Sequence, residues 1–330
     1  MPSWSRSSDR QSELAHLGDG PWTRAQLESL GWTRHQLERD ARAGRLVRVR
    51  RGLYAAAATD WSAPASYAAF VAAAPGSVVS HESCARVAGM WLPLDPDDRV
   101  HLTTEERPLR HDPSVRRHRA ALPVDDVELR EGVPFTRVAR TAVDLALGRP
   151  LPRALAALDC ALGKLALGPA WCTPAGRVLL ATDAGAAGEL RALDVLGGAL
   201  ARAAGRNGCR ALARAAPWVS ARSESPYESW SRGVLIEAGL VPESVGFEVR
   251  GASGRRYFAD MAWPSRRILV EVDGLTKYGQ HHGTVRERLA AERHRQADLE
   301  DAGWTVVRWT AGEPARVIVD RVRRALAVSA

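Results

Sequence analysis

The sequence predicts a multi-domain α/β protein with a small basic unit near its N-terminus, a mostly helical middle and a C-terminal mixed sheet flanked by helices. Three observations support this prediction. The chain has 330 residues, more than one hydrophobic core usually organises. Towards both ends, stretches with the spacing of helices are followed by stretches with a period of two. Between them, residues 140–213 are rich in Ala and Leu at helical spacing.

Composition and charge restrict the class of protein. Hydrophobic residues make up 45% of the chain and charged residues 25%, as in water-soluble globular proteins. The net charge of +8 favours a polyanionic partner, although a genome that prefers Arg codons would produce the same balance. The four cysteines have no paired spacing, so we expect a cytoplasmic protein without a disulfide framework or zinc site.

No membrane segment is expected. Residues 1–20 are polar and lack the apolar core of a signal peptide, so they are predicted to be flexible or weakly helical. The most apolar tract, residues 151–167, is interrupted by Pro, Arg, Asp and Lys and is too short to span a bilayer.

Residues 21–58 are predicted to form a winged helix-turn-helix. Thr23 and Thr33 each stand where they can cap a short helix, and Gly31 and Gly44 follow the two helices. After Gly44 the period changes to two, as in a β-hairpin. In the winged plan, the second helix enters the DNA major groove and the hairpin contacts the backbone or minor groove.

Eight arginines against three acids make this unit basic. Phosphate contacts from such side chains supply affinity and carry little sequence information. An alternative is that the winged fold serves protein contacts and the arginines serve solubility. The candidate DNA-binding residues are Arg34, Arg39, Arg45, Arg48, Arg50 and Arg51.

Short motifs recur along this part of the chain. They are Gly31 to Leu37, Gly44-Arg-Leu-Val-Arg-Val49 and Gly52-Leu-Tyr54, with looser likeness at Val79–Ser83, Val100–Thr103 and Ala139–Asp144. In these motifs the chain resembles the N-terminal domain of AbiEi-type antitoxins. The resemblance implies that the first domain binds operator DNA and that the next contacts or neutralises a toxin. The partners it implies are therefore DNA and a cognate toxin, and a homodimer partner is a further alternative.

Residues 59–218 are predicted to form the mostly helical middle, which would couple or scaffold the two ends. Helices are expected over residues 63–74 and 81–90, and short strands over residues 99–103 and near Phe135.

Residues 222–330 are predicted to form a third domain with the order α-β-β-β-α-β-α. Ser223-Glu-Ser-Pro226 is a helix start signal. The expected elements are a helix at 227–238, strands at 247–250, 256–262 and 268–273, a charged helix at 285–301, a strand at 304–309 and a helix at 315–328.

Acidic residues gather where two of these strands meet. If the strands around Asp260 and Glu271 pair as a hairpin, the two carboxylates lie side by side, and Asp273 shares a face with Glu271. Carboxylates that finish a buried strand are costly without compensation, which a divalent cation usually supplies. Glu228, on the first helix, would supply a third oxygen. The sequence therefore predicts a Mg²⁺ (or Mn²⁺) site at Glu228, Asp260 and Glu271.

Such an ion would activate water and neutralise the charge that grows on a scissile DNA phosphate. Asp273 would act as a ligand or orienting acid, and Lys277 would stabilise the developing charge. Each of these residues also has a structural explanation without a functional role. Asp260 and Glu271 would be surface acids at strand ends, Glu228 would form an i,i+4 helix pair with Arg232, and His281 would lie in a solvated loop.

The C-terminal third resembles the PD-(D/E)xK nuclease core, closest to the domain family related to very-short-patch-repair (Vsr) endonucleases. The resemblance implies a restriction-endonuclease-like domain. The class has a lysine two residues after the second acid, but Asp273 stands there. Lys277 or His281 would replace that lysine, or the site would bind metal without cutting. The motifs are Asp260 with Glu271-Val-Asp-Gly274, Ser225-Pro-Tyr-Glu-Ser229, Asp298-Leu299 and Ala302-Gly-Trp304.

The sequence thus predicts a DNA-binding protein with a Mg²⁺-dependent endonuclease-like domain. The alternative is a non-catalytic transcriptional regulator or antitoxin of a type IV toxin–antitoxin-like system, in which the C-terminal fold only binds nucleic acid or a partner.

Overall fold

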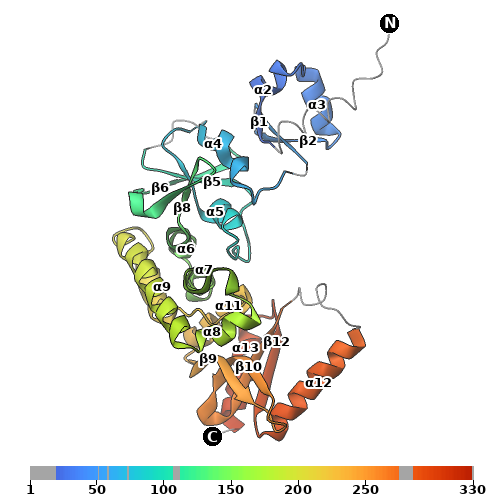
Figure 1. Ribbon diagram of the computed structural model, residues 1–330, viewed down its shortest axis with the longest axis vertical. Helices are drawn as coiled ribbons and strands as arrows, with labels where there is room; N and C mark the ends of the chain where they lie inside the picture. Colours follow the sequence, from blue (N-terminus) through green and yellow to red (C-terminus); the bar gives the residue numbers. More distant parts are fainter. Residues whose placement is uncertain are drawn as a thin grey trace. The chain divides into compact units, whose positions relative to one another are not determined.

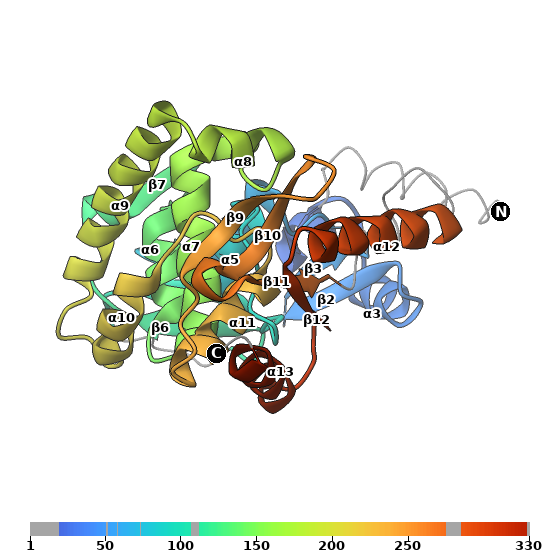
Figure 2. The same cartoon turned by 90° about the horizontal axis from the view of Figure 1, so that it is seen from below.

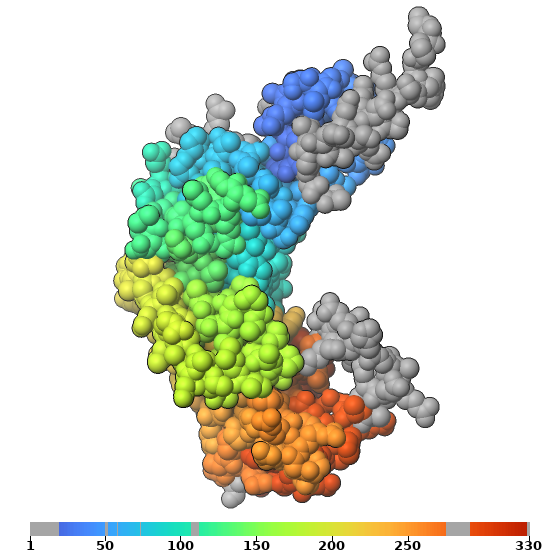
Figure 3. All heavy atoms as spheres, viewed as in Figure 1, coloured from blue at the N-terminus to red at the C-terminus, as the bar shows by residue number. Residues whose placement is uncertain are grey.

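The computed structural model describes residues 20–50, 52–57, 59–72, 74–106, 112–274 and 285–328, which are coloured in Figure 3. The expectation for the N-terminal segment concerns residues 1–19, which lie outside this part. The chain divides into two compact units, residues 1–141 and 142–330, and each has its own buried hydrophobic clusters. The described residues form three sheets, so the mixed α/β class is confirmed. The predicted boundaries near residues 58 and 218 stay predictions.

The first unit begins with two short helices and a three-stranded sheet of order β1-β3-β2. Thr23 and Thr33 form capping boxes with Gln26 and Gln36, so both helices begin where expected. The elements and their order are those expected for a winged helix-turn-helix. They are β1 (Trp22–Thr23), α2 (Arg24–Ser29), α3 (Arg34–Arg42), β2 (Leu46–Arg50) and β3 (Leu53–Ala56).

A small core of its own holds this helix–helix–hairpin segment together. Its aromatic and aliphatic side chains come from both helices, the sheet and the turn between the helices. Burying six such side chains stabilises the fold by roughly 1.5–3 kcal/mol each. The members are Trp22, Leu27, Trp32, Leu37, Leu46 and Tyr54.

The rest of the first unit is a five-stranded sheet of order β6-β5-β4-β8-β7 with short helices beside it (Figure 1). Its elements are η1 (Pro64–Tyr67), α4 (Ala68–Ala72), β4 (Val78–Val79), α5 (His81–Val87), β5 (Val100–Thr104), β6 (Val115–Arg119), η2 (Val124–Asp126), β7 (Val127–Arg130) and β8 (Val133–Thr136).

This sheet corrects the expectation of a mostly helical middle. Of its five strands, only β5 and β8 were predicted. Two of the missed strands, β6 and β7, lie at the edges of the sheet, and both contain charged residues that are exposed in β6 and half-buried in β7. Edge strands carry charged side chains and therefore lack a continuous hydrophobic signal. The third, β4, has only two residues, too few to show a period.

Helices do dominate from residue 138 to residue 218, as predicted. The helix α6 (Val138–Ala146) runs across the division between the units, and the long helix α7 (Leu151–Leu167) is buried along most of its length. Among the described residues no single helix is long and apolar enough to cross a membrane; one pair passes only together, bent by 110°. The remaining elements are η3 (Gly168–Ala170), α8 (Pro174–Leu180), α9 (Asp183–Arg202), α10 (Cys209–Ala215) and η4 (Ala216–Trp218).

The C-terminal sheet has the order β12-β11-β10-β9, with β11 and β12 parallel and the other pairs antiparallel (Figure 2). One face packs on helices α11 and α13 through a cluster that contains Trp263 and Trp309. The predicted order α-β-β-β-α-β-α is confirmed. The elements are α11 (Pro226–Glu237), β9 (Ser244–Arg250), β10 (Arg256–Trp263), η5 (Pro264–Arg266), β11 (Ile268–Asp273), α12 (Val285–Asp301), β12 (Thr305–Thr310) and α13 (Ala315–Val328).

Helix α11 lies against α7 because a glycine permits their close approach. A methyl group on Gly233 would lie 2.4 Å from the Cα atom of Pro152. We expect Gly233→Ala to lower the free energy of unfolding by about 1–3 kcal/mol, as overpacking usually does. Urea unfolding measures this change.

Gly197→Ala in α9 is the matched control, since nothing lies within 4 Å of a methyl group at that position. It is expected to be neutral or to stabilise by up to about 1 kcal/mol, because Ala favours helix more than Gly does. Equal losses from the two substitutions would contradict the role of Gly233 in helix packing.

Candidate functional site

The predicted DNA-binding arginines differ in how strongly they are engaged by acids. Arg34 lies 2.9 Å from Glu38 one turn along α3. Arg45 forms an ion pair and hydrogen bond with the buried Asp40. Arg39 lies 3.6 Å from the same carboxylate, and 57% of its side chain is exposed.

Arg48 is exposed on β2, in the hairpin. Arg50 ends that strand, and Arg51 lies outside the described residues. The cations that point to solvent in this unit therefore come from both α3 and the hairpin. Arg45, in contrast, fastens the turn after α3 to Asp40, a role that its spacing in the sequence did not indicate.

The three predicted metal ligands of the second unit lie on three different elements. Glu228 lies in the first turn of α11, Asp260 in β10 and Glu271 in β11. Lys277 and the histidines at 281 and 282 lie outside the described residues. Asp273 ends β11, where strand alternation puts it on the same side as Glu271.

Asp260 stands where the pairing of β10 with β11 stops. The last paired residues are Met261 and Val270, so the register would place Asp260 opposite Glu271, as the sequence predicts. The backbone N–H of Val272 instead donates to the Asp260 carboxylate at 2.6 Å. The side chain thus replaces a ladder hydrogen bond and holds the two strands at their point of separation.

Glu228 is fixed by the start of its own helix. Ser225 caps α11 by accepting from the N–H of Glu228 at 3.2 Å, and the Glu228 carboxylate accepts from the N–H of Glu224 at 2.7 Å. Burial, followed by the negative charge of Asp260, raises the pKa of Glu228 well above its ordinary value. Asp260 is therefore close enough to disfavour the ionisation of Glu228.

Glu271 is 7% exposed and is held by arginines from two later elements. Arg295 of α12 donates a hydrogen bond to it, and Arg308 of β12 lies 3.8 Å away. Burial nevertheless raises the pKa of Glu271 to about 7; Arg295 opposes this rise and Asp260 adds to it. The two guanidinium groups therefore offset the burial of this carboxyl only in part.

A pocket of about 290 Å³ opens beside Glu228 and Asp260. Arg177 of α8 lines it and binds Glu224 through two hydrogen bonds. The guanidinium carbon of Arg177 also lies 5.8 Å from the centre of the Phe258 ring. The pocket therefore combines carboxylates with a cation at its rim, as a site for a phosphate-bearing ligand with a metal would require.

Donor chemistry fits a hard divalent cation, since all three predicted ligands are carboxylates. Glu228 and Glu271 each have a raised pKa and each interacts with Asp260. The ligand oxygens of the three acids do not all lie within 4.8 Å of one another, however. Among the described residues, three histidines of the first unit bring ligand atoms within 4.8 Å of one another.

Comparison with known proteins bears mainly on the N-terminal end. Residues 9–57 match the family model described as a transcriptional regulator of the AbiEi antitoxin type. This match coincides with the basic helix–helix–hairpin segment and confirms the expected resemblance there. The likeness of the last third to PD-(D/E)xK nucleases stays a prediction.

More distant relatives extend over most of the chain. Two uncharacterised proteins, from two strains of Mycobacterium tuberculosis, are each 28% identical to it over 295 residues. The alignments cover 88% of this chain and 92% of each relative, so the likeness extends well beyond the residues that the family model matches. No solved structure matches the chain significantly.

One alternative considered for the acidic site is wrong: Arg232 does not pair with Glu228 but binds Asp159 of α7 at 2.6 Å. Asp298, for which the sequence suggested no role beyond the Vsr-like motif, accepts hydrogen bonds from Ser253 and Tyr257 and so secures the turn between β9 and β10. Arg177 was missed altogether, because nothing near it in the sequence marks it as part of the pocket.

Proposed function

We propose that this protein is a DNA-binding transcriptional regulator of the antitoxin type, which contacts DNA through α3 and the hairpin of β2 and β3. The observation that carries the proposal is the AbiEi-type match over residues 9–57, where the basic helix–helix–hairpin lies. Exposed cations on both elements, such as Arg39 and Arg48, support it. They would bind phosphates on either side of a groove that α3 enters.

Fluorescence anisotropy with the full chain tests this proposal. The labelled duplexes are the DNA upstream of the protein's own coding sequence and a scrambled duplex of equal length. We expect tighter binding to the upstream duplex and a steep loss of affinity as salt rises, because phosphate contacts release counterions. Failure to bind either duplex at low salt would overturn the proposal.

A partner follows from the same assignment. We propose that a cognate toxin binds the part of the chain that follows the DNA-contacting segment. The alternative partner is a second copy of this chain. Co-purification of the chain with the product of the adjacent gene tests the toxin, and light scattering of the chain alone tests the second copy.

The acidic site favours a second candidate function, metal-dependent hydrolysis of DNA phosphodiester bonds. The specific observation is that Glu228 and Glu271, on separate elements, both have raised pKa values and both face Asp260. Perturbed carboxyl groups beside a pocket are a feature of functional sites. Mg²⁺ or Mn²⁺ held there by Glu228, Asp260 and Glu271 would supply Lewis acidity and an activated water.

This chain's own residues would do the rest. The Val272 N–H and the α11 start hold Asp260 and Glu228 in place. Arg295 would give up its hydrogen bond to Glu271 when an ion binds, and its charge would then face the bound phosphate. Asp273 would act as a ligand or orienting acid, and Lys277, which lies outside the described residues, would stabilise the charge that develops on the phosphate.

Nicking of supercoiled plasmid should depend on pH in a defined direction. Below pH 7 the Glu271 carboxyl holds its proton, since its pKa is about 7, and it then binds a cation poorly. We expect cleavage with Mg²⁺ or Mn²⁺ to fall by at least about tenfold per pH unit below 7, because the pKa of Glu228 is raised as well and both carboxyl groups must lose a proton to bind the ion.

Asp260→Ala should lack this cleavage, whereas Glu300→Ala on the exposed side of α12 serves as the control that keeps it. No nicking by folded wild-type protein with either metal at any pH would remove the second candidate. The regulator proposal would stand unaffected by that result.

A further inference from the structure

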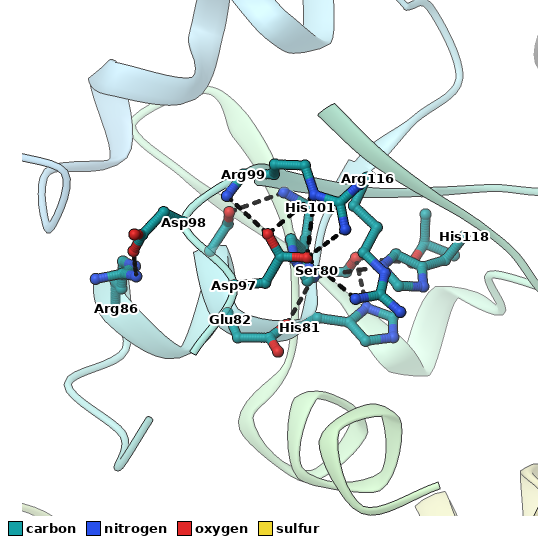
Figure 4. A network of polar contacts seen from close by, with 12 residues as sticks. Ser80, His81, Glu82, Arg86, Asp97, Asp98, Arg99, His101, Arg116 and His118 are labelled. Atoms are coloured by element: carbon teal, nitrogen blue, oxygen red, sulfur yellow. Dashed lines mark hydrogen bonds and ion pairs between the residues drawn. The ribbon is translucent and has the colours of Figure 1, made fainter. Parts of the chain in front are cut away.

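Three histidines from separate elements meet in the five-stranded sheet of the first unit (Figure 4). His81 begins α5, His101 lies in β5 and His118 in the neighbouring edge strand β6. Each offers one ligand nitrogen, and these nitrogens all lie within 4.8 Å of one another. No function described above uses them, and they lie far from the acidic site in the sequence.

Their spacing suits coordination. The Nε2 atom of His118 lies 3.3 Å from the Nδ1 atom of His101. Two nitrogens bound tetrahedrally to Zn²⁺ at about 2.0–2.1 Å are separated by about 3.3–3.4 Å. The ring of His81 stacks on that of His118 with centroids 3.5 Å apart. Metal ions bind the neutral form of imidazole through one ring nitrogen of each histidine.

Carboxylates surround the most buried of the three rings. His101 is 1% exposed; its Nδ1 lies 2.6 Å from Glu82 Oε2 and its Nε2 lies 3.5 Å from Asp97 Oδ2. Within the part of the chain that the structure describes, neither His101 Nε2 nor Glu82 Oε2 has a hydrogen-bond partner of good geometry. Buried polar atoms are rarely left in this condition unless an ion or water completes them.

Asp97 is fixed beside His101 by two arginines. Its carboxylate accepts hydrogen bonds from Arg99 at 2.6 Å and from Arg116 at 3.0 Å. A negative group facing the outer nitrogen of a histidine is the usual second partner of a metal-bound imidazole, since it fixes the ring and increases its basicity.

The start of α5 is also arranged around these rings. Ser80 is the N-cap residue, yet its hydroxyl does not cap the helix. It accepts from Thr103 at 2.8 Å and lies 2.9 Å from the Nδ1 atom of His81. His81 itself has φ 49°, in the left-handed region that non-glycine residues seldom adopt. The local structure thus positions the His81 ring at some cost to the helix start.

We propose that His81, His101 and His118 bind one divalent transition-metal ion of the Zn²⁺ class, with Asp97 orienting His101 and Glu82 beside the ion. Imidazole nitrogen selects Zn²⁺, Ni²⁺, Co²⁺ or Cu²⁺ over Mg²⁺ or Ca²⁺, which prefer oxygen. A three-histidine set leaves one position of a tetrahedral ion for water or another ligand. The ion would fasten α5 to the edge of the sheet, independently of the functions proposed above.

Titration of the chelator-stripped full chain with Co²⁺ tests the proposal, with Zn²⁺ used to displace the bound Co²⁺. We expect one Co²⁺ per chain, with intense visible d–d absorption typical of tetrahedral coordination. His81→Gln and His118→Gln, each at a half-exposed position, should weaken Co²⁺ binding by more than about a hundredfold, beyond the 10–100-fold typical of losing an outer partner.

His294→Gln, on the exposed side of α12 in the second unit, is the matched control and should bind Co²⁺ as the wild type does. Glu271→Ala should also keep the site, which separates it from any Mg²⁺ bound by the acids. Circular dichroism checks that each variant is folded. Absence of stoichiometric Co²⁺ and Zn²⁺ binding by the wild type, or equal binding by folded His81→Gln and His118→Gln variants, would overturn the proposal.

Discussion

Asp159→Ala is expected to lower the free energy of unfolding of the second unit by about 3–5 kcal/mol, the usual cost of removing one partner from a buried ion pair. Asp159 is 0% exposed and binds Arg232, whose side chain is 4% exposed, at 2.6 Å. Its carboxylate also accepts from the N–H of Ser220 at 2.8 Å. The alanine variant would leave the Arg232 charge buried without its counterion.

Burial raises the pKa of Asp159 even though Arg232 opposes the rise. The ion pair therefore offsets the loss of hydration only in part, and the large effect expected comes from the stranded arginine rather than from the strength of the pair. The pair joins α7 to α11, which carries Glu228. Loss of the pair should for this reason also disturb the acidic site.

Urea unfolding followed by circular dichroism measures this loss. Where the two units unfold in separate transitions, the change is expected in the transition of the second unit. Asp320→Ala is the matched control: its partner Arg323 lies 3.9 Å away and both side chains are 60% exposed, so a loss below about 1 kcal/mol is expected. If Asp159→Ala lowers the free energy of unfolding no more than Asp320→Ala does, the role assigned to the buried Asp159–Arg232 pair is wrong.

Replacing Arg39, Arg42 and Arg48 together by Ala is expected to weaken binding to the upstream DNA by several hundredfold at about 0.1 M salt. Each side chain is exposed, two of them on α3 and one on the hairpin. Each phosphate contact contributes about 0.9 to the slope of log affinity against log salt, so the slope should fall by about 3. The scrambled duplex should lose affinity in proportion, because phosphate contacts do not read sequence.

Arg323→Ala, an exposed arginine of α13 in the second unit, serves as the control and should leave both the affinity and the slope unchanged. Arg45→Ala is expected to weaken DNA binding less than replacement of an exposed, unengaged arginine would, because the Arg45 guanidinium group already forms an ion pair with Asp40. If the triple variant binds with the wild-type slope, the DNA contact lies elsewhere in the chain.

Features set by neighbouring residues were accessible from the sequence. The threonine caps place the starts of α2 and α3, because a cap and its partner lie three positions apart. The α-β-β-β-α-β-α order of the second unit followed from changes in hydrophobic period. The approach of Asp260 to Glu271 also followed, because a tight turn between two strands sets their register.

Edge strands and long-range pairs were not accessible in this way. Strand β6 reads as a polar loop, since only Val115 is buried, yet it brings His118 to His101. The expectation of no zinc-type site relied on cysteine spacing and did not consider histidines spread along the chain. A sheet can bring such residues together only once its strand order is known.

Spacing along the chain also suggested the wrong ion-pair partner where burial determines the pairing. Helical spacing suggests a Glu228–Arg232 pair, but packing of α11 on α7 places Arg232 against Asp159, and a buried cation takes the partner that is buried with it. By itself the sequence determined the starts of α2 and α3, the succession of helices and strands along the C-terminal part and the basic N-terminal segment, because these depend on short-range spacing. Only the tertiary structure decided the partners of Arg232 and Glu271 and the meeting of the three histidines, because those contacts join residues that the chain brings together only on folding.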